Sequence, residues 1–526
     1  MSRDLSGTRD GAGHAIVIGS SLAGLTAAAV LARHMERVTV IERDRLPSDA
    51  QWRPGVAQSR HAHNLMAAGH QGLGQLFPGI QQELLDAQMV SVRVPEDMLM
   101  LAPGGWIPRF ETGMTMMTGT RDIVDAVVRD RLRAEPKVTF LQEHEVVGLQ
   151  GGPGDSVTGV RVRAKDKDAK GGWGEPEPMA AEFVVDAAGR KSRAPQWLGE
   201  LGYDKPAESV VDAKTAYGTT VYEPPAGHTA DWKCILLLAT PENPRQGILN
   251  PIEDGRWMVS VSASGGNRPP TDHEGMLEGA KSLRHPVVYE AIKDATPVGP
   301  VYGSGRTENR WRHFEKLRRW PDRFLVIGDA LAAFNPSYGQ GMSVAVQSAL
   351  LLDRMLESRG TAGGGTQRLR RALAKQVAVA WQLATAIDLH YPWAAEASPP
   401  DLPTRLGMRY VDRVGAAAPT DHDAARVVLE LAQLLAAPTA VFRPRVLRSA
   451  LRGPRGPVST DPPRAPHGAG PARQSDRSAA DAPTTSRASR APGAAAPRPA
   501  DEADETAPGA DDRAISSPSH RKTRSS

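Results

Sequence analysis

The stretch VIGSSLAGLTA, residues 17–27, constrains the fold of this chain more than any other part of it. It joins a short apolar run, HAIVIG (14–19), to an Ala- and Leu-rich segment, LAGLTAAAVLARHM (22–35), and RVTVIE (37–42) follows. Two β-branched runs flanking a helical segment predict a βαβ unit, which implies a parallel sheet with a right-handed crossover. We therefore expect an α/β fold whose first unit is built around this turn.

The turn itself has the form Gly19-x-Ser21-x-x-Gly24, a dinucleotide-binding pattern with serine in place of the middle glycine. Gly19 permits the bend, a small residue at 21 lets backbone N–H groups reach a pyrophosphate, and Gly24 lets helix and strand pack closely. The helix N-terminus would face the phosphates. Glu42 ends the second strand, where a carboxylate binds ribose hydroxyls, and Arg43 follows it. These features favour a Rossmann-like dinucleotide site.

Two other interpretations of this turn stay open. Gly19-x-Ser21-x-Ala23 nearly matches the nucleophile elbow of a hydrolase, which also lies on a strand-to-helix turn. That interpretation requires an acid and a histidine downstream and gives Glu42 no role. The turn could also serve only to pack a helix.

A second segment, LVIGDALAAFNPSYGQGMSVAVQSALL (325–351), suggests the other half of the site. Asp329 follows a buried strand and could bind a polyol hydroxyl. Pro336 stiffens the loop, and Gly339 and Gly341 bring bare backbone close to a flat ligand. A helix starts at once, so its N-terminal dipole can stabilise negative charge on a ring. In a reduced flavin that charge lies around N1 and C2=O.

With these motifs in this order, the chain resembles the FAD-dependent monooxygenases of the aromatic-hydroxylase fold. Within that group it is most similar to the flavin epoxidases of polyether antibiotic biosynthesis, of the monensin and lasalocid type. The resemblance covers about residues 14–450 and includes ERDRLP, RPGVAQSRHAHNL, VVDAAGRKSR and GDALAAFNPSYGQGMS.

The resemblance implies a role for each matching residue. Gly19, Ser21 and Gly24 would line the FAD pyrophosphate, Glu42 the adenosine ribose, and Arg43 the adenosine end. Further FAD contacts are implied for Arg60 and Arg121 at the phosphates, Asp329 at the ribityl chain, and Pro336, Gly339, Gly341 and Met342 at the flavin ring.

The resemblance also implies the domain plan, a glutathione-reductase-type FAD domain with an interleaved antiparallel-sheet substrate domain and a helical C-terminal part. The FAD-binding domain would comprise 13–90, 120–204 and 301–357, and the substrate domain 91–119 and the sheet at 205–300. A helical region would occupy 358–452. The tail, 453–526, is rich in Pro, Ala, Arg, Ser, Gly and Asp, a composition typical of disorder.

Composition excludes several classes of protein. Cys234 is the only cysteine, so the chain has neither an intrachain disulfide nor a cysteine-rich metal site, and a cytoplasmic location is expected. The formal net charge is only +4, and the tail contributes much of the basicity, so we expect no nucleic-acid partner. No apolar stretch is long enough to predict a membrane span.

The expected reaction is transfer of one oxygen atom from a flavin C4a-hydroperoxide to an alkene of an apolar polyene or polyketide, with O2 as co-substrate. This reaction needs no protein nucleophile, and the sequence indicates no catalytic acid or base. NAD(P)H would supply electrons. The hydroxylases carry an Asp-Gly middle motif where this chain has Asp186-Ala187-Ala188-Gly189-Arg190, so a separate flavin reductase could be the direct donor.

Three alternative functions remain: an alkene (prenyl) reductase, an aromatic hydroxylase, and an interaction protein that acts through its tail. His61 and His63 have no further ligand cluster nearby, so we expect them beside the ring or in a loop rather than on a metal. Trp106 is expected in the core or the substrate pocket. The charged run 306–320 is expected to be a solvated connection or a docking site for a reductase or carrier protein.

Overall fold

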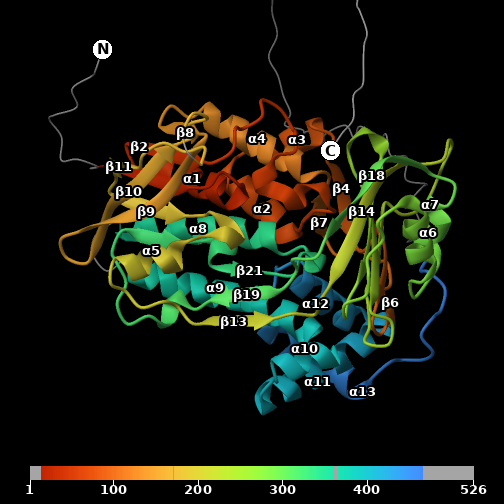
Figure 1. The fold of residues 1–526 in the computed structure, drawn as a ribbon. Helices are drawn as coiled ribbons and strands as arrows, with labels where there is room; N and C mark the ends of the chain where they lie inside the picture. Colours follow the sequence, from red (N-terminus) through yellow and green to blue (C-terminus); the bar gives the residue numbers. More distant parts are fainter. Residues whose placement is uncertain (1–12, 170, 360–364, 466–526) are drawn as a thin grey trace, which may run out of the picture. The chain divides into compact units, whose positions relative to one another are not determined.

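We analysed a computed structural model of the chain, which describes residues 13–169, 171–359 and 365–465 (Figure 1). Its first layer is a five-stranded parallel sheet with the order β20-β12-β1-β2-β8. The strands are β1 (His14–Ile18), β2 (Arg37–Glu42), β8 (Val138–Gln142), β12 (Phe183–Asp186) and β20 (Phe324–Val326). The predicted βαβ unit is confirmed: β1 pairs in parallel with β2, and α1 (Leu22–His34) connects them.

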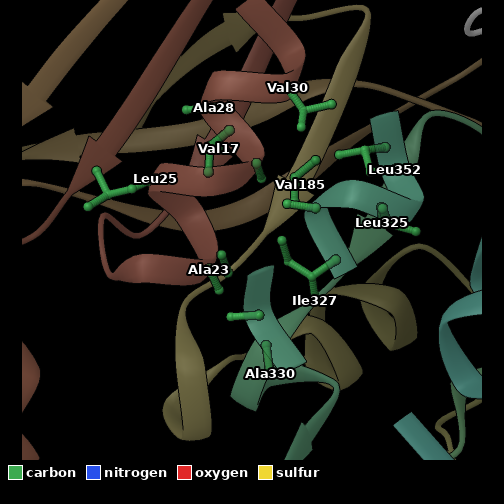
Figure 2. Close-up of a cluster of buried hydrophobic side chains, with 14 of the residues drawn as sticks. Val17, Ala23, Leu25, Ala28, Val30, Val185, Leu325, Ile327, Ala330 and Leu352 are labelled. Atoms are coloured by element: carbon green, nitrogen blue, oxygen red, sulfur yellow. The ribbon is translucent and has the colours of Figure 1, made fainter. Parts of the chain in front are cut away.

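The sheet is apolar because helices cover it, and β1 is buried along its whole length. α1 packs against α8 (Gly341–Arg359) and α4 (Arg121–Arg133). Figure 2 shows the core beneath the first turn, where side chains from α1, the strand ends and α8 interdigitate: Val17, Ala23, Leu25, Ala28, Val30, Val185, Leu325, Ile327, Ala330 and Leu352. The alanines of α1 allow it to lie close to the sheet, so the core fixes the position of the turn.

The second layer is a seven-stranded sheet with the order β18-β14-β17-β16-β15-β5-β6. Its strands are β5 (Met98–Ala102), β6 (Gly105–Trp106), β14 (Ala216–Glu223), β15 (Cys234–Leu237), β16 (Arg245–Pro251), β17 (Trp257–Ala263) and β18 (Thr296–Ser304). Of the predicted 91–119 segment, only β5 and β6 pair into this sheet, whereas Val90–Val94 and Met114–Thr118 belong to a separate sheet. However, β5 pairs with β15 in parallel, so the sheet is mixed rather than wholly antiparallel.

Three smaller sheets complete the strands. β9 (His144–Gly152), β10 (Ser156–Ala164) and β11 (Glu177–Ala180) form an antiparallel meander, and β4 (Val90–Val94) and β3 (Asn64–Leu65) flank β7 (Met114–Thr118). β19 (Asn309–Arg312) pairs with β13 (Glu208–Val211) and with β21 (Ala332–Ala333). The predicted limits of the 205–300 sheet are therefore wrong at both ends, because β13 pairs elsewhere and β18 runs to Ser304.

The predicted helical region 358–452 divides between two neighbours. α9 (Gly365–Asp388) packs against α8 and β20, whereas α11 and α12 share a core with strands β4, β5 and β7. The remaining helices are α2 (Ala67–Leu76), α3 (Ile80–Asp86), α5 (Ala194–Glu200), α6 (His273–Lys281), α7 (Val287–Ile292), α10 (Pro392–Ala397), α11 (Leu402–Ala417), α12 (His422–Ala432) and α13 (Pro444–Arg452). Among the described helices, none is long and apolar enough to cross a membrane.

The expectation of disorder from residue 453 onward is wrong for residues 453–465. This segment lacks regular secondary structure, yet Trp106 Nε1 donates a hydrogen bond to the carbonyl of Thr460 at 3.0 Å. Arg455 forms an ion pair with Asp421 at 2.8 Å. These contacts hold the segment against the substrate layer. The rest of the predicted tail, 466–526, lies outside the described residues.

Candidate functional site

A cavity of about 2560 Å³ lies between the parallel sheet and the seven-stranded sheet. The turn after β1 lines one region of it and the loop before α8 lines another. Strands of the substrate layer and the C-terminal helices line the remainder. Both motifs singled out in the sequence therefore face one space.

The turn after β1 has the tight geometry that its glycines predict. Gly19 has φ +96°, and a Cβ there would lie 2.8 Å from the carbonyl oxygen of Ala187. A Cβ on Gly24 would lie 1.9 Å from the carbonyl oxygen of Gly19, so the packing role predicted for Gly24 is confirmed.

The serine at position 21 is compatible with this turn. Ser21 is the N-cap of α1 with φ −81°, a conformation that any residue adopts, and its side chain makes no capping hydrogen bond. Glycine is not required there, and Ser21, Leu22 and Ala23 at the start of α1 line the cavity, where a helix N-terminus favours an anion.

Glu42 is buried beside the turn and has several partners. Its Oε2 accepts hydrogen bonds from Ser20 N at 3.0 Å and Ser20 Oγ at 2.6 Å, and Arg53 Nη1 lies 3.0 Å away. Oε1 accepts from Asp44 N at 3.0 Å. Burial acts to raise the pKa of Glu42, but Arg53 and these hydrogen bonds outweigh it and hold the pKa below its usual value. Glu42 is therefore a fixed anion at the end of β2.

Two of the three arginines predicted near the FAD, Arg43 and Arg60, differ in placement. Arg43 is exposed and lines the cavity. The guanidinium of Arg60 instead lies between the rings of Trp52 and Tyr302, 3.8 and 4.3 Å from their centroids, and is not part of the cavity lining. Cation–π stacking holds Arg60 in this position, and its predicted role at the FAD phosphates stays a prediction. Arg53, in the same RPGVAQSR stretch, lies at the turn after β1, where it pairs with Glu42.

Asp329, Gly341 and Arg190 converge at the end of β20. A Cβ on Gly341 would lie 3.9 Å from Asp329 Oδ1, and Arg190 Nε lies 4.0 Å from Asp329 Oδ2. Burial raises the pKa of Asp329, against the opposing charges of Arg190, Arg121 and Arg310. The carboxylate thus sits beside the first residue of α8, as its predicted role requires.

The loop before α8 is tightly turned. Pro336 opens a 3-10 turn that Gly339 closes at φ +67°, and α8 begins at Gly341. Pro336, Gly339, Gly341 and Met342 all line the cavity. Two buried polar atoms here, Ser337 Oγ and Gln340 Oε1, have no hydrogen-bond partner.

These unpartnered atoms fit a ligand such as FAD, whose pyrimidine ring carries both donors and acceptors. A buried polar group without a partner is costly, so a ligand that hydrogen-bonds to it gains affinity. The turn at Gly19, the anionic Glu42 and the bare backbone at Gly339 and Gly341 fit the diphosphate, ribose and ring of the same molecule. The individual contacts stay predictions.

A buried carboxylate that the sequence did not reveal anchors this loop. Asp388, at the end of α9, accepts hydrogen bonds from Tyr338 Oη, from Asn309 Nδ2 at 2.5 Å and from Asn335 Nδ2 at 3.4 Å. Burial raises the pKa of Asp388 to about 6, although these donors oppose the rise. Asp388 therefore ties the predicted ring-binding loop to α9.

Arg121 and two histidines lie between the two motifs. Arg121, the first residue of α4, is buried and pairs with Asp125 at 2.9 Å. Burial and the charge of Arg121 lower the pKa of His63 to about 3, and burial with the charge of Arg60 lowers that of His61 to about 4. Both histidines are neutral and line the cavity. Within the described ranges, no group of three or more potential ligands could hold a metal.

The strands of the seven-stranded sheet, together with β7, line their part of the cavity with uncharged side chains. Met98 and Met100 of β5, Met116 of β7, Leu236 of β15 and Ile248 of β16 face this space. Trp106, expected in the core or the pocket, is a core residue and is not among the lining residues. This half can hold a flexible apolar molecule, because methionine adapts to varied shapes.

Comparison with known proteins identifies the kind of site. The sequence pattern described as "FAD binding domain" matches residues 13–386, well over half of the chain. The chain belongs to the FAD-binding domain family. As a member it is a flavoprotein, and the cofactor predicted for the cavity is FAD.

Two curated proteins are similar to this chain in sequence. Protein Rv3254 of Mycobacterium tuberculosis is 32% identical over 425 residues, which cover 77% of this chain and 86% of that protein. Kynurenine 3-monooxygenase of Salinispora arenicola is 26% identical over 362 residues, which cover 65% of this chain and 72% of that enzyme.

Several solved structures have a similar fold. The flavin-dependent brominase Bmp2 aligns with a TM-score of 0.59 at 13% identity over 84% of this chain and 98% of that one. The p-nitrophenol 4-monooxygenase PnpA of Pseudomonas putida aligns with a TM-score of 0.57 at 17% identity over 81% and 99%. The predicted fold class, the FAD-binding aromatic-hydroxylase fold, is therefore confirmed.

Proposed function

We propose that this protein is an FAD-dependent epoxidase that adds one oxygen atom to an alkene of a long apolar polyene, such as a polyketide of secondary metabolism. The observation that carries the proposal is the cavity. Its volume of about 2560 Å³ exceeds the roughly 300–1,000 Å³ typical of a single small-molecule site. FAD would occupy the part between Gly19 and Gly341, which leaves the uncharged, methionine-lined part for a large apolar substrate.

The proposed reaction consumes one O2 and one NAD(P)H for each epoxide formed. One atom of O2 enters the alkene to form the epoxide, and the other leaves as water. NAD(P)H, directly or through a reductase, supplies two electrons and a proton, and solvent supplies the second proton. FAD, when bound, supplies the chemistry that activates dioxygen with these electrons.

The residues of the chain would bind, orient and shield. The N-terminus of α8 at Gly341 would stabilise negative charge on a ring placed there, and Asp329 would hold a polyol hydroxyl. Met98, Met100 and Met116 would hold the alkene in place and keep water out. His61 and His63 stay neutral and would add no charge to the site.

Aromatic hydroxylation is the second candidate, supported by the names of kynurenine 3-monooxygenase and p-nitrophenol 4-monooxygenase among the similar proteins. It accounts less well for the large apolar volume, since a single aromatic ring fills only a small part of it. The prenyl reductase alternative uses the same cofactor but inserts no oxygen.

Product analysis with isotopically labelled dioxygen tests the proposal. The FAD-loaded protein, an NAD(P)H-driven flavin reductase and candidate polyenes should give a product that gains one labelled oxygen and loses one double bond. Asp329→Ala should lose most of its bound flavin and turnover together. A saturated product without label would identify a reductase, and label on an aromatic ring a hydroxylase; either outcome would overturn the epoxidase proposal.

A further inference from the structure

The exposed apolar side chains of this protein are concentrated in one region. Of the eleven large apolar residues exposed within the described ranges, eight lie between Ile387 and Leu451. The most exposed of them are Leu402 (59%), Leu406 (55%), Phe442 (60%) and Leu451 (67%). Isolated exposed leucines are ordinary, but a contiguous group marks an interaction surface.

Six of these eight residues lie on α11, on α13 or just before α13. α11 packs against α13, and the ring of Tyr410 stacks on that of Phe442 with centroids 5.0 Å apart. Leu402 and Leu406 lie one turn apart on α11, as Leu447 and Leu451 do on α13. In Figure 1 these helices lie at the lower edge, away from the parallel sheet. We call them the α11–α13 surface.

The same surface is strongly basic. α11 and α13 carry six exposed arginines and one acidic residue, Asp412, which pairs with His390 at 2.8 Å. Among these arginines one described ion pair occurs, Arg445 with Asp423 at 3.9 Å. The arginines are Arg405, Arg409, Arg413, Arg445, Arg448 and Arg452. A surface that combines leucine and phenylalanine with arginine is typical of helices that lie in the interface of an anionic membrane.

The surface also continues into the cavity. Gly407, Met408 and Val411 of α11 line the cavity, and so does Phe442. A ligand that left a bilayer beneath this surface would therefore meet the cavity wall without crossing water. Such an arrangement suits apolar molecules, whose concentration in bulk water is low.

We propose that the α11–α13 surface docks this protein on an anionic lipid bilayer, with the leucines in the headgroup–acyl boundary and the arginines on the phosphates. The described helices include none that spans a bilayer, so the attachment is peripheral. A second copy of the chain fits less well, because two arginine-rich faces repel. Residues 466–526 contain one large apolar residue, Ile515, and so cannot cover the leucines. The proposal does not depend on which reaction the site performs.

Vesicle co-sedimentation of the full chain tests the proposal. We expect binding to vesicles of phosphatidylcholine with phosphatidylglycerol, and weaker binding to phosphatidylcholine alone or at high salt. Leu402→Ser/Leu406→Ser and Arg448→Glu/Arg452→Glu should each weaken binding about tenfold or more. Leu85→Ser, at an exposed leucine of α3, is the matched control and should bind as the unaltered chain does.

FAD content and thermal midpoint should be unchanged in all three variants, since none of the altered side chains lines the cavity. No vesicle binding by the full chain, or equal binding by the surface variants and the control, would overturn the proposal. Binding to an acidic carrier protein without binding to vesicles would also overturn it. So would vesicle binding that appears only after removal of residues 466–526.

Discussion

The phenol of Tyr338 donates a hydrogen bond to the buried carboxylate of Asp388, which joins the loop before α8 to the end of α9. Asn335 and Asn309 donate to the same carboxylate, and Asn335 N donates to Asn309 Oδ1 at 2.8 Å. The loop that would contact the flavin ring is thus held by a group that can gain a proton near pH 6.

Asp388 should make FAD affinity depend on pH. Burial raises the pKa of Asp388 to about 6, so above that pH the carboxylate is charged and accepts hydrogen bonds from all its donors. Below that pH the carboxyl group carries a proton and accepts fewer hydrogen bonds, which loosens the loop. We expect the FAD dissociation constant to rise about tenfold as the pH falls through 6, measured by flavin fluorescence. Asp388→Asn should bind FAD weakly at every pH. Asp130→Asn, at an exposed residue of α4, is the control; a pH dependence retained in Asp388→Asn would contradict this role.

Arg53 and Arg60 should differ in importance although they lie seven positions apart. Arg53→Met leaves Glu42 buried without its ion pair, so we expect a loss of about 3 kcal/mol of unfolding free energy and at least tenfold weaker FAD binding. Arg60→Met removes only stacking on Trp52 and Tyr302, worth about 1 kcal/mol, and should leave FAD affinity nearly unchanged. Equal effects on FAD affinity would show that the assignment of Arg53 to the turn is wrong. Urea unfolding and FAD titration provide both measurements.

Two glycine substitutions should separate folding from ligand binding. Gly24→Ala places a Cβ 1.9 Å from a backbone oxygen, so we expect little folded protein. Gly341→Ala meets its nearest neighbour at 3.9 Å, and alanine favours a helix, so the thermal midpoint without FAD should hold or rise. Its methyl group enters the cavity where the ring is predicted, so FAD affinity should fall tenfold or more. Unchanged affinity in Gly341→Ala would place the ring elsewhere.

The neutral histidines should make the fold sensitive to acid. Burial lowers the pKa of His61 from 6.5 to about 4, so between these values the unfolded chain binds a proton that the folded chain does not. Unfolding free energy is therefore greatest above pH 6.5 and falls by about 1.4 kcal/mol per pH unit as the pH drops toward 4. His63 adds a similar slope. Urea unfolding should show a shallower pH dependence for His61→Gln, and an identical slope in variant and parent would contradict the buried neutral state.

The sequence predicted those elements whose conformation depends on residues close together in the chain. The run from His14 to Glu42 has a strand, a glycine turn, an alanine-rich helix and a second strand, an order that admits one topology. Gly24 must be glycine because a side chain there would clash with the backbone of the turn. The Asp329 to Met342 segment was found in the same way. In both cases neighbouring residues determine the conformation.

Contacts between distant segments were less predictable. Arg53 reaches Glu42 across a loop whose path depends on tertiary packing, so the sequence did not indicate that Arg53 lies at the turn. Asp388 meets Asn309 of β19 and both Asn335 and Tyr338 of the loop before α8, and nothing near Asp388 in the sequence indicates its burial. The parallel pairing of β5 with β15 likewise joins strands more than a hundred residues apart.

The roles assigned to the site residues all depend on a single FAD that spans the cavity from the turn after β1 to the loop before α8. A crystal structure of the FAD-loaded protein measures this directly. We predict the diphosphate at the first turn of α1 near Ser21, the ribose at Glu42 and the flavin ring against the backbone of Gly339 and Gly341. FAD bound in any other place, or a groove at 339–341 filled by side chains, would contradict the account.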